Sequence, residues 1–308
     1  MAKVAFVFPG QGSQKVGMGK EAFDASEAAR VVFEAADRAL DAPLSELCFE
    51  GPEEALKLTA NTQPAILTNS VALLRAFGES PDVTAGHSLG EYSAHVCAGS
   101  LRFEDAVRLV RKRGQFMQDA VPVGVGAMAA ILKLEDAQVR QICEETDGIV
   151  EPVNYNSPGQ VVIAGEVAAV EAAGARVKEL KGRAMPLPVS APFHCSMMKP
   201  AEEALTPHLA EIAFVDPALA VYVNVDAVPV RTADEARDAL RRQVARPVRW
   251  TESVERMVAD GVGLFVEIGA GSALKGMIKR IAKDVPCVSV QGPGDFEAAR
   301  AAIAEARG

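Results

Sequence analysis

Two hydrophobic patterns alternate along the first part of the chain, one typical of buried strands and one typical of amphipathic helices. The opening run "KVAFVF" is almost continuously apolar, which predicts a buried strand. The elements predicted up to residue 122 are, in chain order, a strand at 3–8, helices near 20–40 and 62–78, a weak strand at 82–86, a short helix behind it and a longer helix at 103–120. This alternation predicts an α/β domain.

The segment 126–188 has a different order of elements. Strands are predicted at 127–132, 149–155, 160–165 and 184–188, and helices at 135–146 and 167–180. The order βαββαβ is that of the ferredoxin-like, or split-βαβ, arrangement. Its flanks, "VPVGVG" and "PLPVSAP", are rich in glycine and proline, as linkers are. We therefore predict a small subdomain at 124–192, inserted into a larger α/β domain made of 1–123 and 193–308.

The α/β pattern resumes at about residue 193. Its clearest piece is "GLFVEIGAGSALKGMIKRI" at 263–281, where an apolar run leads into a glycine-rich turn and then into helical spacing. This order predicts a further buried strand followed by a helix, both belonging to the larger domain.

Composition and charge narrow the classes of protein that the chain can belong to. Its 308 residues are 49% hydrophobic and 24% charged, the balance of a globular protein. The net charge of −9 argues against nucleic-acid binding, which depends on neutralising phosphates. No apolar run reaches the roughly 18 residues of a membrane span, and the first apolar run is too short for a secretory signal.

The five cysteines are widely spaced, odd in number and never form C-x-x-C. This spacing predicts neither a disulfide framework nor a zinc site, and no other metal site is predicted. It favours a reducing cytoplasm.

The stretch "AGHSLGEYSAHVCAG" places Ser88 between two glycines in the pattern G-x-S-x-G. A nucleophilic serine needs a sharp turn from strand to helix, and Gly86 and Gly90 allow such a turn to pack closely. The N-terminus of the following helix suits an oxyanion, so the Leu89 backbone N–H is a candidate donor. The alternative is a tight turn in which Ser88 only caps the helix.

Four histidines are candidates for the base that a serine nucleophile needs. His87 adjoins Ser88 and should point away from it, His95 should be a packed or surface residue, and His208 lies in an ordinary helical run. By elimination we predict His194, in the loop "VSAPFHCSMM" at the end of the subdomain. The alternative is a histidine that caps a helix.

No acidic residue stands out in a loop between Ser88 and His194, so the Ser–His–acid triad of ordinary hydrolases is the wrong template. The glycine-rich "FPGQGSQ" at 8–14 also fails as a dinucleotide loop, because Lys15 stands where G-x-G-x-x-G needs its third glycine. A backbone N–H of this loop can instead serve as a second oxyanion donor.

Together, these motifs resemble one family. The chain contains, in order, "FPGQGSQ", "TQPAILTNS", "GHSLGEYSA", "RGQFMQDAVPVGVGAMAAI", "NYNSPGQVVIAG", "PVSAPFH" and "RRQVARPVRWTESV". The set resembles the malonyl-CoA:acyl carrier protein transacylases of bacterial fatty-acid synthesis over essentially the whole chain. The resemblance implies a hydrolase-like parallel-sheet core with helices on both faces, plus the inserted ferredoxin-like subdomain.

The resemblance also implies roles for individual residues. Ser88 would be the nucleophile and His194 the base. The backbone N–H groups of Gln11 and Leu89 would donate to the oxyanion, and Arg113 would bind the malonyl carboxylate. The main-chain carbonyl of Gln243 would accept a hydrogen bond from the histidine, and Met117 and Phe193 would line the pocket. Two positions depart from the family pattern, Arg246 in "VARP", where asparagine is frequent, and His95, where leucine is frequent.

Helical spacing bears on Arg113 independently. Arg113 lies on the shoulder of an apolar stripe that ends at Gly114 and Met117, whereas Lys112 lies on the opposite, solvated side. An inward-leaning arginine needs an anionic partner, and the alternatives are a nearby Asp or Glu or, from the resemblance, the malonyl carboxylate.

The chemistry implied is ping-pong transfer from malonyl-CoA, through malonyl-Ser88, to the phosphopantetheine thiol of an acyl carrier protein, with no tightly bound cofactor. Carrier proteins of this pathway are acidic, which predicts docking on a local basic patch of this acidic chain. The candidate patches are Lys181 with Arg183, and Lys275, Lys279 and Arg280 with Lys283.

Three other functions are compatible with the same motifs. A serine thioesterase or esterase shares the chemistry up to the acyl-enzyme. A malonyltransferase that serves a polyketide or malonate-decarboxylase carrier would share it throughout. A non-enzymatic module that only binds the carrier protein would not use Ser88 at all.

Overall fold

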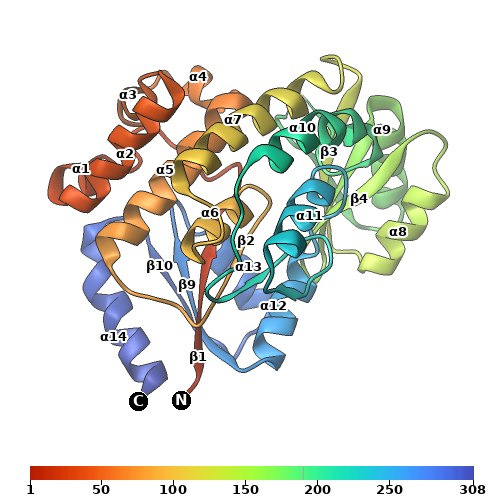
Figure 1. The fold of residues 1–308 in the computed structure, drawn as a ribbon. Helices are drawn as coiled ribbons and strands as arrows, with labels where there is room; N and C mark the ends of the chain where they lie inside the picture. The colour runs from red at the N-terminus through yellow and green to blue at the C-terminus, as the bar shows by residue number, and fades with distance from the viewer. Residues whose placement is uncertain (190) are drawn as a thin grey trace.

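The computed structural model describes residues 1–189 and 191–308, and Ser190 of the "PVSAPFH" motif lies outside them. The fold is mixed α/β, with one sheet of mainly parallel strands and a second, antiparallel sheet (Figure 1). The large sheet has the strand order β10-β9-β1-β2-β7-β8, in which only β8 runs antiparallel to its neighbour. Its strands are β1 Lys3–Phe8, β2 Val83–Gly86, β7 Ala220–Tyr222, β8 Pro229–Val230, β9 Val262–Ile268 and β10 Cys287–Val290.

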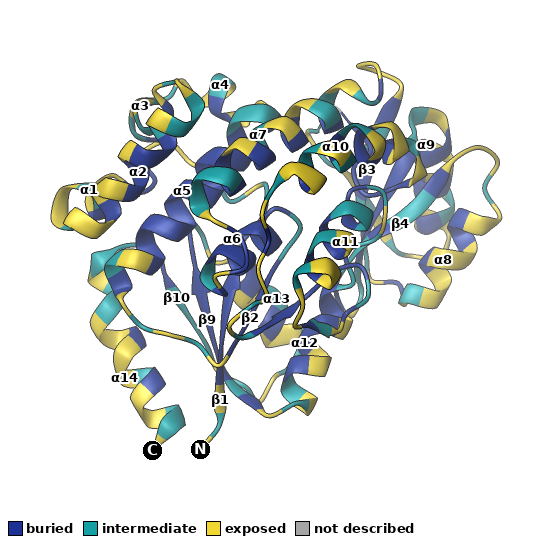
Figure 2. Ribbon diagram, in the orientation of Figure 1, coloured by how far each residue is buried: buried dark blue, intermediate teal, exposed yellow. Residues whose placement is uncertain are grey.

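The large sheet is buried on both faces because β1 is apolar at successive positions. Val4, Phe6 and Phe8 belong to one hydrophobic core, and Ala5 and Val7 belong to another. Successive side chains of a strand point to opposite faces, so this run fills the space beneath helices on both sides of the sheet. Figure 2 shows the central strands as largely buried, with many of the exposed residues on the outer helices. The predicted strand at 3–8 is confirmed.

Most of the chain outside the strands is helical. The helices associated with the large sheet are α1 Lys20–Ala25, α2 Glu27–Leu40, α3 Leu44–Glu50, α4 Glu53–Lys57, α5 Thr59–Phe77, α6 Gly90–Cys97, α7 Phe103–Asp119, α10 Lys199–Glu211, α11 Ala233–Gln243, α12 Trp250–Ala259, α13 Ala273–Ile281 and α14 Phe296–Arg307. Two short 3₁₀ segments occur at Ser196–Met198 and Pro293–Asp295.

The helical pattern predicted near 20–40 is divided into two helices. Ser26 has an extended backbone, with φ −136°, and its side chain accepts a hydrogen bond from the backbone N–H of Ala29. A serine in this position caps the next helix, which explains the break between α1 and α2. The strand at 82–86, the helices at 62–78 and 103–120, and the strand and helix within 263–281 all correspond to observed elements, with ends that differ by a few residues.

The segment between α7 and α10 forms the second sheet. Its elements are β3 Gly126–Leu132, α8 Asp136–Glu144, β4 Val150–Ser157, β5 Gln160–Glu166, α9 Val167–Glu179 and β6 Arg183–Pro186. The strands are antiparallel in the order β4-β5-β3-β6, and α8 and α9 pack on them over a separate hydrophobic core. Every element predicted in this segment is present, and the two sheets lie at different ends of the molecule (Figure 1).

Candidate active site

Ser88 sits in the turn that connects β2 to α6. Its backbone is left-handed, with φ 51°. A Cβ atom at Gly86 would lie 1.9 Å from the backbone of Gly90, and one at Gly90 would lie 2.0 Å from the carbonyl oxygen of Phe8. No side chain fits either position, so both glycines of G-x-S-x-G are required by close backbone approach. The turn therefore presents Ser88 beyond the carboxyl ends of the parallel strands.

The structure brings Ser88 and His194 together from opposite ends of the inserted segment. Ser88 Oγ lies 2.7 Å from His194 Nε2, and His194 Nδ1 lies 2.9 Å from the backbone carbonyl oxygen of Gln243. A carbonyl only accepts hydrogen bonds, so the imidazole proton is on Nδ1 and Nε2 is free to accept from the serine hydroxyl. A main-chain carbonyl thus occupies the place that an acidic side chain has in a triad.

Burial keeps this imidazole neutral. His194 is 3% exposed, and burial, reinforced by the charge of Arg113, lowers the pKa of His194 to about 3. A neutral imidazole at pH 7 can accept the proton of a serine hydroxyl, as a general base must.

The hydrogen bonds of the other three histidines go to residues other than Ser88, although His87 lines the same pocket. His87 pairs with Asn156, with 2.8 Å between His87 Nε2 and the amide oxygen, and not with Ser88. His95 is fully buried and bonds Ser100, which decides for packing over exposure. His208 lies on α10 beside Lys112.

Gln11 and Leu89 both line the pocket that contains Ser88. Neither N–H donates to another atom of residues 1–189 or 191–308. Backbone N–H groups without a partner are the kind of donor that an oxyanion needs.

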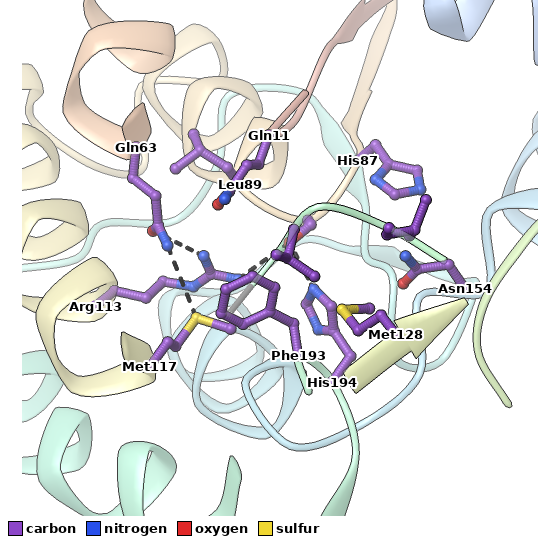
Figure 3. Close-up of a pocket in the computed structure, with 13 residues that line it drawn as sticks. Gln11, Gln63, His87, Leu89, Arg113, Met117, Met128, Asn154, Phe193 and His194 are labelled. Carbon is purple, nitrogen blue, oxygen red and sulfur yellow. Dashed lines mark hydrogen bonds between the residues drawn. The ribbon is translucent and has the colours of Figure 1, made fainter. Parts of the chain in front are cut away.

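Arg113 enters the pocket from α7. It is 1% exposed while the neighbouring Lys112 is exposed, as the helical stripe predicts. Its guanidinium donates to Gln63 Oε1 at 2.8 Å, a contact that Figure 3 shows. It also donates to Gln243 Oε1 at 2.9 Å and to Ser88 Oγ at 3.2 Å. No carboxylate of the described residues lies within ion-pair distance of it. The structural pair with an Asp or Glu, one of the two alternatives raised by the sequence, is therefore not formed.

The pocket around these groups is small, with a volume of about 110 Å³. Met117 and Phe193 line it, together with Met128 of β3 and Leu187 that follows β6. It thus lies where the two sheet-bearing parts of the chain meet, and Figure 3 shows its side chains converging from both. An apolar wall beside one buried cation suits a short acyl group that ends in an anion.

Four residues of the site escaped the sequence reasoning as side-chain contributors: Gln63, Glu91, Asn224 and the amide of Gln243. Asn224 Oδ1 accepts from the Ser88 backbone N–H at 2.7 Å, and Gln243 Nε2 donates to the Ser88 carbonyl at 3.0 Å. Gln63 and Glu91 fall inside the motifs "TQPAILTNS" and "GHSLGEYSA", which is the signal that could have singled them out. Asn224 had no such signal.

Three further features bear on the remaining expectations from the sequence. The Arg246 side chain, one of the two departures, is exposed. Within the described ranges no group of three or more His, Cys, Asp or Glu side chains is placed to hold a metal ion. Among the helices of those ranges, none has both the length and the apolar character needed to cross a membrane.

Comparison with known proteins places this geometry in a family. The sequence model of the acyl transferase domain matches residues 5–299. The chain belongs to the acyl transferase family. It is 51% identical to the malonyl CoA-acyl carrier protein transacylase of Escherichia coli K12 over 306 residues, covering 97% of this chain and 99% of that protein.

Solved structures agree with this family assignment. A malonyl CoA-acyl carrier protein transacylase from Clostridium perfringens superposes on this acyltransferase with a TM-score of 0.95 and 45% identity, covering 99% and 98% of the two chains. A malonyl-transacylase solved in complex with a type II PKS acyl-carrier protein has a TM-score of 0.94 and 46% identity, covering 97% and 99%. The resemblance seen in the sequence is thereby confirmed.

Proposed function

We propose that this acyltransferase moves the malonyl group of malonyl-CoA to the phosphopantetheine thiol of an acyl carrier protein, through a malonyl ester of Ser88. One observation supports it above the others. The Ser88 hydroxyl, which is paired with His194, lies 3.2 Å from the buried guanidinium of Arg113. This guanidinium has no carboxylate partner among the described residues. The names of the E. coli and C. perfringens relatives agree with this substrate pair.

In the first half-reaction Ser88 Oγ attacks the thioester carbonyl and passes its proton to His194 Nε2. The carbonyl oxygen becomes an oxyanion that accepts from the N–H groups of Gln11 and Leu89. The C–S bond then breaks, and coenzyme A leaves as a thiol with the proton that His194 returns. The products are malonyl-Ser88 and free coenzyme A, with no electron transferred.

The second half-reaction reverses these steps with a different thiol. The phosphopantetheine thiol gives its proton to His194 and attacks the malonyl ester, and Ser88 Oγ leaves with that proton. Since the same imidazole serves both directions, it must be neutral when each thiol or hydroxyl arrives, and burial favours the neutral form by lowering its pKa.

Arg113 selects the acyl group in this proposal. Its guanidinium binds the free malonyl carboxylate, which takes the place of the missing anionic partner. Met117 and Phe193 pack along the methylene of the malonyl group. No tightly bound cofactor and no metal enter the proposal.

The carrier protein is proposed to dock on a basic patch of this acidic chain. Lys181 and Arg183 are exposed near β6, and Lys275, Lys279 and Arg280 are exposed on α13, with Lys283 just beyond. A local positive field is needed to attract an acidic partner against a net charge of −9. The pathway proposed is fatty-acid elongation in the cytoplasm, without nucleic-acid or membrane partners.

For the fold, we propose two units: a hydrolase-like domain of 1–123 and 193–308 with helices on both faces, and a ferredoxin-like subdomain of 124–192. The antiparallel order β4-β5-β3-β6 and the separate core of that segment support the second unit. The parallel order β10-β9-β1-β2-β7 supports the first.

Intact-mass measurement after mixing with malonyl-CoA tests the function. We expect one malonyl adduct on the wild type and none on Ser88→Ala. Addition of a carrier protein bearing phosphopantetheine should discharge the adduct onto that protein. Release of free malonate without transfer would indicate a thioesterase, and an adduct that persists in Ser88→Ala would reject the nucleophile.

A further inference from the structure

Glu91 is a fully buried carboxylate just behind the reactive serine. It lies in the first turn of α6 and is 0% exposed. Burying a carboxylate is costly unless hydrogen bonds compensate it. Its Oε2 accepts from the backbone N–H of Asn224 at 2.7 Å and from Gln243 Nε2 at 2.9 Å, while Oε1 has no partner among the described residues. One oxygen atom therefore makes all of its hydrogen bonds.

The bond to Gln243 decides which way that amide faces. Gln243 Nε2 also donates to the Ser88 carbonyl, and Gln243 Oε1 accepts from Arg113 Nη2 at 2.9 Å. If the amide turned over, its oxygen would face the Glu91 oxygen and its NH₂ would face the guanidinium. Both contacts would be repulsive, since each would pair like with like. By accepting from Gln243 Nε2, Glu91 keeps the amide turned so that its Oε1 faces Arg113.

The bond to Asn224 supports the serine turn from the other side. The Asn224 backbone is fixed by Glu91, and its side-chain amide spans the turn. Asn224 Oδ1 accepts from the Ser88 N–H at 2.7 Å, and Nδ2 donates to the Gly86 carbonyl at 2.7 Å. These contacts restrain a serine whose left-handed backbone is unfavourable by itself.

We propose that Glu91 is a positioning residue for acyl transfer, whose single acceptor oxygen fixes the Ser88 turn through Asn224 and the Arg113 guanidinium through Gln243. The inference rests on the proposed function only for the role of Arg113; the restraint on Ser88 is independent of the acyl group. We expect the place of the oxygen to matter more than the charge, because both hydrogen bonds of the side chain converge on Oε2.

Two conservative variants separate place from charge. Glu91→Gln keeps an oxygen at the position of Oε2 and removes the charge, whereas Glu91→Asp keeps the charge and withdraws the oxygen by one methylene. Glu91→Ala removes both. Glu267→Ala is the matched control, since Glu267 is also 0% exposed and accepts two backbone N–H bonds, from Leu274 and Lys275, but contacts none of the four site residues Ser88, Arg113, Asn224 and Gln243.

The first readout is the rate at which a fluorophosphonate probe labels Ser88, which involves no malonyl group. We expect Glu91→Gln to stay within about threefold of wild type, and Glu91→Asp and Glu91→Ala to fall by roughly 10- to 100-fold, the scale of a small misplacement at a reacting centre. The second readout is the ratio of malonyl to acetyl acylation, which should fall in the same two variants and stay constant in Glu91→Gln and Glu267→Ala.

Several outcomes would overturn the proposal. If Glu91→Asp labels faster than Glu91→Gln, the charge matters and not the oxygen. If Glu91→Asp labels as fast as wild type, Glu91 only fills space. This result does not depend on whether Glu91→Ala folds. Wild type that labels with the probe but forms no malonyl adduct would contradict the proposed function and leave the restraint on Ser88 to be judged by the labelling rates alone.

Discussion

Ser88 and His194 are joined by a hydrogen bond of 2.7 Å, and both have left-handed backbones, with φ 51° and 66°. Such a conformation costs roughly 1–3 kcal/mol at a residue other than glycine, so it persists only where the surroundings enforce it. Here the Asn224 and Gln243 side chains hold the backbone of Ser88, and the Gln243 carbonyl holds the imidazole. The two residues proposed to react are thus both held in a backbone conformation that their surroundings must stabilise.

Removal of the imidazole should slow acylation without abolishing binding. We expect His194→Ala to lower the single-turnover rate of malonyl-Ser88 formation by about 10²–10⁴, the contribution of a positioned general base. Quenched-flow mass spectrometry measures this rate. His208→Ala is the control, since His208 lies on α10 beside Lys112 and should leave the rate unchanged. A rate for His194→Ala within threefold of wild type would point to another base.

The choice of acyl group should depend on Arg113. Acetyl lacks the terminal carboxylate, so we expect Arg113→Ala to lose malonyl transfer and to keep or gain acetyl transfer. The loss of discrimination should reach about 2–5 kcal/mol, as for other desolvated charge pairs that are broken. The measurement is kcat/KM for both thioesters. Lys112→Ala is the control, because Lys112 neighbours Arg113 in sequence and is exposed. Equal losses for both thioesters would show that Arg113 is only structural.

The acylation rate should not fall on mild acidification. The pKa of His194 is lowered by burial, and next by the charge of Arg113, to about 3. A base with a lowered pKa stays deprotonated down to that pH, so the imidazole remains neutral where an exposed histidine would already be charged. We expect the single-turnover rate to be level between pH 8 and pH 5, within the range in which the fold is intact by circular dichroism. A drop centred near the ordinary histidine pKa of about 6.5 would contradict this environment.

Charge reversal on the basic patches should separate the two half-reactions. Lys279→Glu with Lys283→Glu reverses one patch, and Lys181→Glu with Arg183→Glu reverses the other. At the patch that receives the carrier protein, we expect the rate of transfer to the carrier to fall by about tenfold or more at low salt, while acylation by malonyl-CoA is unchanged. The other patch then serves as the control. Equal losses in both half-reactions, or losses in neither, would reject a docking role for these residues.

The sequence by itself determined the elements whose pattern repeats over consecutive residues. The apolar run of β1 and the βαββαβ order of the inserted segment were predicted in this way, because strand and helix periods are properties of neighbouring residues. The inward position of Arg113 followed from helical spacing on α7, and it was confirmed. The close packing around Ser88 followed from the two glycines. The break at Ser26 was missed, because a capping serine does not interrupt the helical period of the side chains around it.

Only the tertiary structure decided which side chains meet. Ser88 and His194 are separated by 106 positions, and no periodicity relates residues on different elements. The same holds for the amides of Gln63, Asn224 and Gln243 and for the buried Glu91 beside them. These residues come from four separate parts of the chain, α5, the loop after β7, α11 and α6, which meet near the carboxyl ends of the parallel strands. Hydrogen bonds between such groups depend on distances and directions that packing alone fixes, and a local pattern of apolar and polar residues contains neither.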